Sequence, residues 1–359
     1  MPFFSPTNVL PRQELALAIV EGELAIGGLV GAKILPDFPV TRRTAHLIKA
    51  TLAGSQALRT IANAKYIRAP GTKFERITAQ FADDTFTVVL RGVEIVIPNE
   101  VNLDYDGYFD PEAFYASRFG REISGLTKEQ LIETAIFNTA TFGAATNSAI
   151  AYTQANLGTM TPVGDLIAAT RRLKAKGEPP PYACVVSGTV YERIRQATDT
   201  RNFLVGSLKG VTEVTKSALE LALKEFGITQ LLIADSYVNL AADGAAPSLS
   251  PVWPVTYIWT GRPGLATGIG TDLEPSKETS VGGGLGVPML GGVGANIFWQ
   301  GWANSIPSDE GDIEDFEGGN YVESYYLREI DSEVLRIKMS SQPYIGNVRA
   351  GDLIATQYS

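Results

Sequence analysis

Two residue types that carry much of enzyme chemistry are almost missing from this chain. Its 359 residues include one cysteine, Cys184, and one histidine, His46. One cysteine forms no intrachain disulfide, and together the pair does not complete a His/Cys zinc site. The sequence around His46 also lacks the nucleophile and orienting carboxylate of a catalytic triad. We therefore predict a surface or interface role for His46 and inert, buried packing for Cys184 in its apolar strand.

Targeting signals and long apolar runs are missing as well. Residues Met1 to Phe4 include no basic residue, and Glu21 and Glu23 interrupt the apolar stretch that follows. We expect neither a signal peptide nor a membrane span, and we expect the protein to be made and kept in the cytosol. The chain is 45% hydrophobic and only 19% charged, which excludes wholesale disorder because it supplies enough apolar surface for a core.

Nucleotide-binding and metal-binding motifs are not found. The pairs Gly284/Gly286 and Gly292/Gly294 do not complete G-x-G-x-x-G, because Met289 and Ile297 stand where the third glycine belongs, and no P-loop is present. The acidic run Asp309–Asp315 departs from the spacing of an EF-hand loop. We therefore assign no catalytic residue, no cofactor-binding residue, no cofactor and no metal ligand, and we predict that the protein is not an enzyme.

Glycines and aromatic residues instead indicate loops and packing. Twelve of the 36 glycines lie between Gly261 and Gly301, which predicts mostly irregular loop there. The tryptophans are not interleaved with lysine or arginine, so no platform for single-stranded nucleic acid is indicated, and we expect them in the core or in subunit contacts. They are Trp253, Trp259, Trp299 and Trp302.

Charge is unevenly distributed within a net charge of −9. From Lys33 to Arg76 there are nine basic residues and two acids, a local balance of +7. From Asp309 to Glu333 there are ten acids and one arginine, a local balance of −9. Either these are two unrelated solvated surfaces, or the basic segment of one copy contacts the acidic segment of another. Composition does not choose between the two.

The first hundred residues predict two parts that do not bury themselves. Pro36 and Pro39 favour an extended arm up to about residue 44. Two strand-like stretches, 65–78 and 85–97, flank a polar turn at Asp83-Asp84, which predicts a long hairpin. An isolated two-stranded ribbon is marginal in water, so both parts need a partner surface.

Helix signals follow. Asp110 and Pro111 open a long helix, and Thr127 to Gln130 reads as a new capping box within it. A second helix begins after Thr161-Pro162 and ends at Gly177, and the prolines 179–181 indicate a domain boundary.

Beyond the prolines, strands and helices alternate. We predict strands at 183–186 and 228–234, helices at 190–197 and 215–227, and further strands after residue 321. The fold class is α+β (mixed α/β).

Several stretches, taken in order along the chain, resemble recurrent segments of one family. They are Ile34-Leu35-Pro36-Asp37-Phe38-Pro39-Val40, Arg68-Ala69-Pro70-Gly71, Phe109-Asp110-Pro111-Glu112, Ala183-Cys184-Val185-Val186-Ser187, the run Glu225 to Asp235, and Gly351-Asp352-Leu353-Ile354. The sequence resembles the HK97-fold major capsid protein of tailed double-stranded DNA bacteriophages. The resemblance implies an N-terminal arm (1–44), an extended E-loop region (45–100), a peripheral domain with a long spine helix (101–181) and an axial domain (182–334). It also implies C-terminal strands (335–359) that return to the peripheral domain.

The same resemblance implies a structural protein that assembles as pentamers and hexamers into an icosahedral head, first in the host cytoplasm and finally as part of the virion. Expected partners are other copies, a separate scaffold, a portal and cement proteins, around double-stranded DNA that is enclosed without sequence-specific binding. Two alternatives remain open. One is an encapsulin-type nanocompartment shell; the other is a cytosolic α/β enzyme with a site in the Gly261–Gly301 loops and Asp272 as acid or base.

Overall fold

A computed structural model describes most of the chain. The described residues are 28–40, 42–50, 81–100, 111, 115, 122–207, 214–241, 248–267, 289–299, 314–316 and 320–358. Within these ranges no helix is long and apolar enough to cross a membrane.

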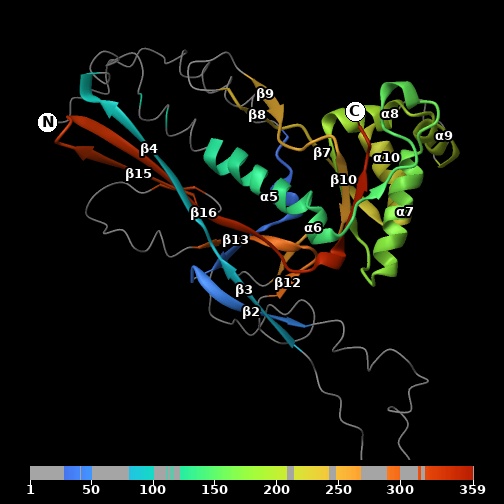
Figure 1. Ribbon diagram of the computed structural model, residues 1–359, viewed down its shortest axis with the longest axis horizontal. Coiled ribbons are helices and arrows are strands. Elements are labelled where there is room, and N and C mark those ends of the chain that lie inside the picture. The colour runs from blue at the N-terminus through green and yellow to red at the C-terminus, as the bar shows by residue number, and fades with distance from the viewer. Residues whose placement is uncertain are drawn as a thin grey trace, which may run out of the picture.

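A five-stranded sheet of order β5-β17-β10-β6-β7 forms the compact end of the molecule, on the right in Figure 1. β6 and β7 run parallel, whereas β10 is antiparallel to both β6 and β17. Every residue of β6 is buried, as expected for a strand covered on both faces. The strands are β5 (Thr146–Asn147), β6 (Tyr182–Ser187), β7 (Ile228–Ala234), β10 (Tyr257–Gly261) and β17 (Gly351–Ala355).

Helices cover one face of this sheet, and local sequence signals explain their ends. Pro162 occupies the first turn of α7, and the Ser187 and Thr215 side chains accept backbone N–H groups at the starts of α8 and α10. Gly227 stops the turn after α10 with a φ of +98°, a conformation that glycine adopts without strain. The predicted strands and helices of this region are confirmed. The helices are α7 (Pro162–Ala175), α8 (Gly188–Gln196), α9 (Thr198–Ser207) and α10 (Lys216–Leu223).

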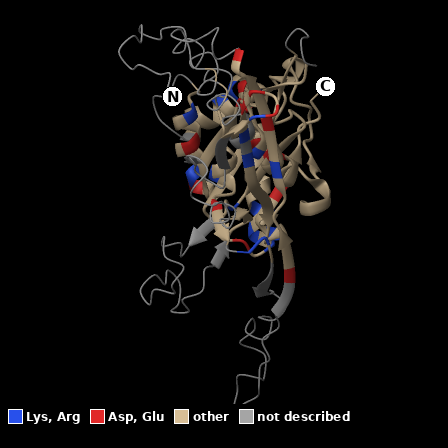
Figure 2. Ribbon diagram, turned by 90° about the vertical axis from the view of Figure 1, so that its left-hand side faces the viewer, with Lys and Arg blue, Asp and Glu red and all other residues tan. Residues whose placement is uncertain are grey.

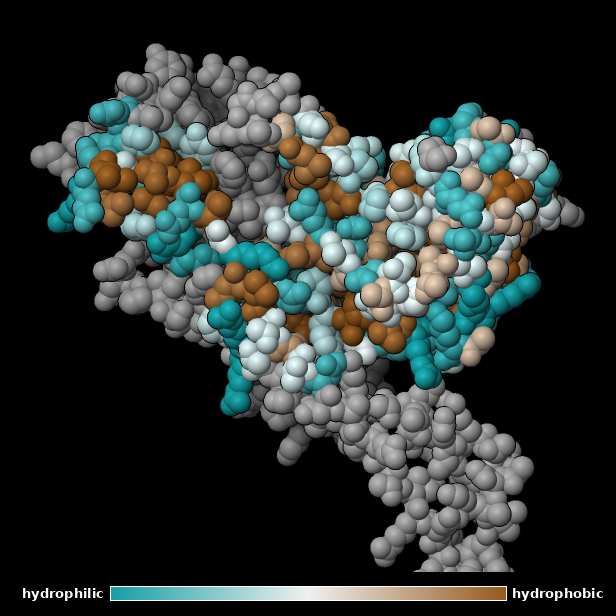
Figure 3. Space-filling view, viewed as in Figure 1, coloured by the Kyte–Doolittle hydropathy of each residue, from teal (hydrophilic) through white to brown (hydrophobic). Residues whose placement is uncertain are grey.

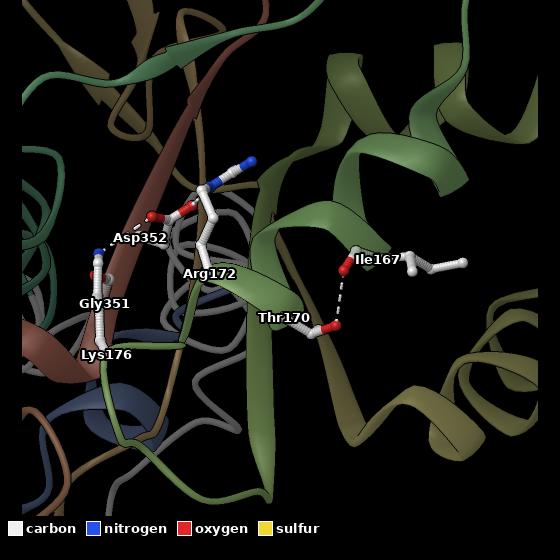
Figure 4. Close-up of polar contacts among 6 residues, drawn as sticks. All are labelled: Ile167, Thr170, Arg172, Lys176, Gly351 and Asp352. Carbon is white, nitrogen blue, oxygen red and sulfur yellow. Dashed lines mark hydrogen bonds and ion pairs between the residues drawn. The ribbon is translucent and has the colours of Figure 1, made fainter. Parts of the chain in front are cut away.

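A charged contact fastens α7 to the sheet. Asp352 of β17 accepts hydrogen bonds from Arg172 Nε at 2.9 Å and Lys176 Nζ at 3.1 Å, and Lys176 also reaches the carbonyl of Gly351 (Figure 4). The Asp352 side chain is only 8% exposed, so its two cations offset much of the cost of burying a charge.

The opposite face of the five-stranded sheet is covered by α5 (Lys128–Ile136) and by the N-terminal segment that contains α2 (Gly31–Ile34). Ile132 and Ile136 of α5 pack with Ile34 and Leu35 in one buried cluster. Trp253 belongs to the same cluster and meets Phe137 edge to face, with ring centroids 5.1 Å apart. A short helix, α6 (Thr139–Phe142), follows α5.

A second, elongated sheet extends away from this body, to the left in Figure 1. Its order is β1-β13-β16-β15-β14, with β4 also paired to β16. β16 is 14 residues long and pairs with β4 and β15 through its first part and with β13 through its second. The strands are β1 (Asp37–Val40), β4 (Leu90–Pro98), β13 (Gly294–Trp299), β14 (Glu314–Phe316), β15 (Asn320–Leu327) and β16 (Ser332–Ile345).

Three two-stranded sheets complete the described fold. One is a ribbon of β2 (Thr44–Ala50) and β3 (Phe81–Thr87). The other two are β8 (Tyr237–Asn239) with β9 (Leu249–Pro251), and β11 (Leu265–Thr267) with β12 (Met289–Gly291).

The predicted hairpin was wrong at its turn, because Asp83 and Asp84 are paired within β3. β3 pairs with β2, and β4 pairs with β16, more than 230 residues further along the chain. The other predicted strand of the hairpin, 65–78, lies outside the described residues, so its pairing stays a prediction.

One local prediction along the middle of the chain also fails. Thr127 has helical backbone angles and its side chain makes no capping hydrogen bond, because a π-helical segment (Glu122–Thr127) runs directly into α5. Within the Gly261–Gly301 region β13 is a regular strand, whereas residues 268–288, where most of the predicted loop falls, lie outside the described residues. Gly292 has a φ of +67° and makes the turn before that strand.

The proline segment at 179–181 does not separate two cores. Leu166 and Leu173 of α7, before the prolines, share one buried cluster with Cys184 and Val186 of β6, after them. β17 likewise lies inside the five-stranded sheet, between β5 and β10. Long-range packing thus joins residues on both sides of the prolines in one core, and the domain boundaries expected from sequence stay a prediction.

Candidate assembly interface

The tip of the elongated sheet exposes apolar side chains on both faces. Val93 and Val96 of β4 are 42% and 49% exposed, and Tyr326 and Ile330 are each 53% exposed. The strand register places Val93 and Tyr326 on one face and Val96 on the other. We call these four residues the tip patch; Figure 3 shows apolar surface at this end of the molecule. Single exposed apolar residues are ordinary, but a group at the end of a thin sheet is typical of a contact surface.

The strands at the tip are nevertheless well fastened to each other. Arg336 Nε donates to Glu94 across the β4–β16 pair at 2.6 Å, and the Arg336 guanidinium lies over the Tyr325 ring, 4.8 Å from its centroid. The Tyr326 hydroxyl donates to the Asp331 carboxylate in the turn between β15 and β16. These contacts fix the register and shape of the tip, although exposed ion pairs add little free energy of folding.

The β2–β3 ribbon is tied to the elongated sheet through β3 and the residues beside it. Phe86 and Val88 pack with Ile297 of β13, and the Tyr344 hydroxyl donates to Asp84 Oδ2 at 2.7 Å. Arg43 Nε donates to the carbonyl of Val88 at 3.1 Å. The ribbon emerges from the lower edge of the body in Figure 1. Among the described residues β2 and β3 pair only with each other, so a further strand could pair at either outer edge.

The N-terminal segment behaves differently from the free arm predicted by its sequence. Val30, Ile34 and Leu35 are buried in the chain's own core. Buried Glu129 of α5 accepts the backbone N–H groups of Val30 and Gly31 at 2.9 Å and the Trp253 indole N–H at 2.6 Å. A Cβ atom at residue 31 would approach Glu129 Oε2 to 2.6 Å, so any other residue there would have to displace the Glu129 carboxylate from its hydrogen bonds. Residues 28–40 are therefore docked on the body, which corrects the prediction for that part of the arm; residues 1–27 lie outside the described residues.

Comparison with solved structures identifies the architecture. No protein-family model and no curated protein matches the chain. A crystal structure of a phage-related protein from Bordetella bronchiseptica RB50 matches with a TM-score of 0.57 and 15% identity, over 95% of this chain and 96% of that one. The chain has an HK97-like fold. The α+β fold class expected from sequence is confirmed.

Two capsid structures are also similar to the chain, at lower scores. The capsid of cyanophage P-SCSP1u has a TM-score of 0.49 and 12% identity, and covers 90% of this chain and 87% of its own. The mature capsid of bacteriophage PhiM1 has the same score and identity, and covers 89% and 84%.

Within this HK97-like fold, the described parts of the basic and acidic segments do not pair with each other. β2 of the basic segment pairs with β3, whereas β15 of the acidic segment pairs with β14 and β16. Along the described parts of the chain, Lys and Arg are interspersed with Asp and Glu (Figure 2). Any sheet contact between the two described parts would thus require two copies of the chain.

The single cysteine and three of the tryptophans lie in packing positions. Cys184 is fully buried in β6, which confirms its predicted packing position, and burial raises the pKa of its thiol to about 12. Trp253 and Trp259 are in the core, and Trp299 packs on the cluster at the base of the ribbon. Trp302 lies outside the described residues.

For the other candidate residues named from the sequence, the structure gives only part of the answer or none. His46 is paired with Thr85 in the ribbon, and its surface or interface role stays a prediction. Asp272, the Gly284/Gly286 pair and residues 309–313 lie outside the described residues. Among the residues that are described, no cluster of His, Cys, Asp and Glu could hold a metal ion. Sequence reasoning missed Glu129, whose partners are about 100 residues or more away and leave no local signal.

Proposed function

We propose that this protein is the major capsid protein of a tailed double-stranded DNA bacteriophage, assembling through pentamers and hexamers into an icosahedral head. The observation that carries the proposal is the HK97-like fold with an exposed tip patch and a ribbon whose two strands pair only with each other among the described residues. In a shell, neighbouring copies cover such surfaces, and each weak contact is multiplied by the number of neighbours.

The proposed organisation follows the boundaries expected from sequence, with changes that packing favours. The arm is 1–44, the E-loop region 45–100, the peripheral domain 101–181, the axial domain 182–334 and the C-terminal strands 335–359. Because α7 and β17 pack with the five-stranded sheet, we assign both to the axial domain. The docked residues 28–40 would then be the root of the arm.

Charge supports an enclosing role rather than specific DNA binding. The chain has a net charge of −9, and such a surface gains little from releasing the counterions of DNA. We propose that the genome is enclosed without sequence-specific contacts, that the shell forms in the host cytoplasm and becomes part of the virion, and that a scaffold, a portal and cement proteins are separate chains.

The test is expression of the full chain in bacteria, followed by light scattering and negative-stain electron microscopy. Shells, tubes or capsomers are the expected result. Amide hydrogen exchange in residues 42–50 and 81–87 should slow when dissociated material assembles. Discrete monomers under all conditions, with a ribbon already protected from exchange, would contradict the proposal and favour the enzyme alternative.

The contents of the particles separate the two shell alternatives. Mass spectrometry of purified particles should find no stoichiometric cargo protein, and particles from infected or induced cells should hold nuclease-protected DNA. A defined cargo protein in every shell would replace the capsid proposal with the encapsulin-type nanocompartment.

A further inference from the structure

The short hairpin of β8 and β9 exposes large apolar side chains. Leu240 and Leu249 are each 66% exposed, and Tyr237 is 39% exposed; we call these three residues the hairpin patch. Leu249 stands opposite Asn239 in the strand register, so it shares the outer face of the hairpin with Tyr237. Val238, on the inner face, packs against the buried cluster that α5 joins. One face of the hairpin therefore rests on the body, whereas the other presents apolar groups to a further surface.

The described part of the chain begins beside this hairpin. Gly28 lies against Asp235, two residues before β8, and a Cβ atom placed on Gly28 would come within 2.9 Å of the Asp235 backbone nitrogen. Leu29 is itself 38% exposed, and Val30 is buried in the cluster against which Val238 packs. In Figure 1 the N-terminal segment, in blue, runs past the β8–β9 hairpin. The 27 residues that precede Gly28 are thus joined to the body at the edge of the hairpin patch.

The sequence just before Gly28 matches this patch in character. Nine of the twelve residues from Leu15 to Ile26 are hydrophobic, and their removal from water would be favourable. The distance is short enough, since Leu249 is opposite Asn239, only four residues beyond Asp235, or about 14 Å along the strand. The eight residues 20–27 alone span up to about 27 Å when extended.

We propose that residues 15–26 dock on the hairpin patch of their own chain, with apolar contacts holding them there. Because the segment is tethered beside the patch, its effective concentration exceeds that of the same segment on another copy. The sequence led us to expect that the first residues of the arm need a partner surface, and the hairpin patch supplies one within the chain. The inference goes beyond the proposed function, and it is tested on dissociated material, so its outcome is independent of whether particles form.

The first experiment is amide hydrogen exchange on the dissociated full chain. The double variant Leu24→Ser with Ile26→Ser should accelerate exchange at residues 237–240 about tenfold relative to the wild type, while exchange in β6 stays unchanged and shows that the body is folded. The matched control, Val9→Ser with Leu10→Ser, makes the same kind of change outside residues 15–26 and should leave residues 237–240 as in the wild type. Equal exchange at these residues in the wild type and the Leu24/Ile26 variant would overturn the proposal.

The second experiment distinguishes a segment of the same chain from one of another copy. Leu24→Cys combined with Leu249→Cys, treated with a short bismaleimide, should give a link within one chain that tryptic peptide mapping identifies. Cys184 should not compete, because it is fully buried and burial raises the pKa of its thiol to about 12.

The control for this link is Leu24→Cys combined with Leu221→Cys. Leu221 is 59% exposed, but it belongs to α10, on the opposite face of the five-stranded sheet, so this pair should remain unlinked. Equal linking of both pairs, or no linking of the Leu24 and Leu249 positions, contradicts docking on the hairpin patch. Covalent dimers joined through the Leu24 and Leu249 positions would assign the patch to the segment of a second copy and overturn the proposal as stated.

Discussion

The two large sheets of this molecule differ in how far their apolar side chains are buried. The five-stranded sheet is covered on both faces, by α7 to α10 on one side and by α5 with residues 30–35 on the other. The elongated sheet ends in a tip whose valines and tyrosine remain about half exposed. The same chain therefore places its folding free energy in one region and leaves surface for partners in the other.

The contrast also separates two kinds of electrostatic contact. Asp352 in the covered sheet is nearly buried between two cations, whereas Glu94 at the tip is paired with Arg336 while half exposed. Removing a partner from a buried pair costs far more than removing one from an exposed pair. Substitutions in the two sheets should consequently differ in size and in what they affect.

The largest effect is expected in the covered sheet. Leu173→Ala removes a fully buried side chain of α7 and should lower the free energy of unfolding by about 2–5 kcal/mol through lost burial and the remaining cavity. Denaturant unfolding measures the change. The matched control is Leu221→Ala on α10, whose side chain is 59% exposed and should change stability by less than about 0.5 kcal/mol. Equal effects at the two sites would remove the contrast.

The next effect concerns the contact of Glu129 on α5 with the docked N-terminal segment. Glu129→Ala leaves the Val30, Gly31 and Trp253 N–H groups without their acceptor, and should cost about 2–4 kcal/mol. Amide exchange at residues 30 and 31 should accelerate more than exchange in β6. Glu192→Ala, which removes an exposed pair on α8, serves as the control. Unchanged exchange at residue 30 would show that Glu129 does not hold the segment.

Local sequence signals predicted the helices on the five-stranded sheet well. They did not predict the contact of Glu129 with the N-terminal segment. Pro162, Ser187 and Gly227 mark helix ends through their own backbone chemistry, so α7, α8 and α10 were predictable. Glu129 lies within the stretch that the sequence predicted to be a capping box. The groups that it actually binds are 98 to 124 residues away, so no local pattern indicated its buried position.

Strand pairing shows the same limit at the candidate interface. The predicted strand at 85–97 covers the end of β3 and most of β4, but the strand partners were not identified, because alternating patterns record which face is buried and not which strand lies alongside. The exposure of the tip patch was not predictable from the sequence either, since valine and tyrosine in a strand normally indicate a core.

A smaller, pH-dependent effect is expected on α5. Burial raises the pKa of the Glu133 carboxyl from 4.5 to about 7, although a hydrogen bond from Thr134 opposes the shift. The folded protein therefore binds this proton more tightly than the unfolded chain does. That stabilising contribution is complete below pH 4.5 and is lost as the pH rises through 7.

The Glu133→Gln variant tests this effect. It should match the wild type near pH 4 and exceed it at pH 8, by on the order of 1 kcal/mol after solvent screening. Thermal unfolding at a series of pH values measures how the stabilities of the two proteins diverge as the pH rises. Parallel stability profiles for the two proteins would contradict the raised pKa.

The smallest effect on folding, and the one that isolates assembly, is expected at the tip. The double variant Val96→Ser with Tyr326→Ser should unfold within about 0.5 kcal/mol of the wild type, because both side chains are half exposed. The concentration needed for assembly should rise about tenfold, equivalent to about 1.4 kcal/mol per subunit added. Val205→Ser on α9, which is 65% exposed, is the matched control. Normal assembly of the tip variant would assign the patch no part in the shell.

β16 has a mechanical consequence. At a rise of about 3.4 Å per residue, its 14 residues form a beam about 45 Å long that has no break between the turn at residues 328–331 and β13. Force applied by a neighbour at that turn is therefore delivered at the far end, beside β13 and the root of the ribbon, with the strand acting as a lever.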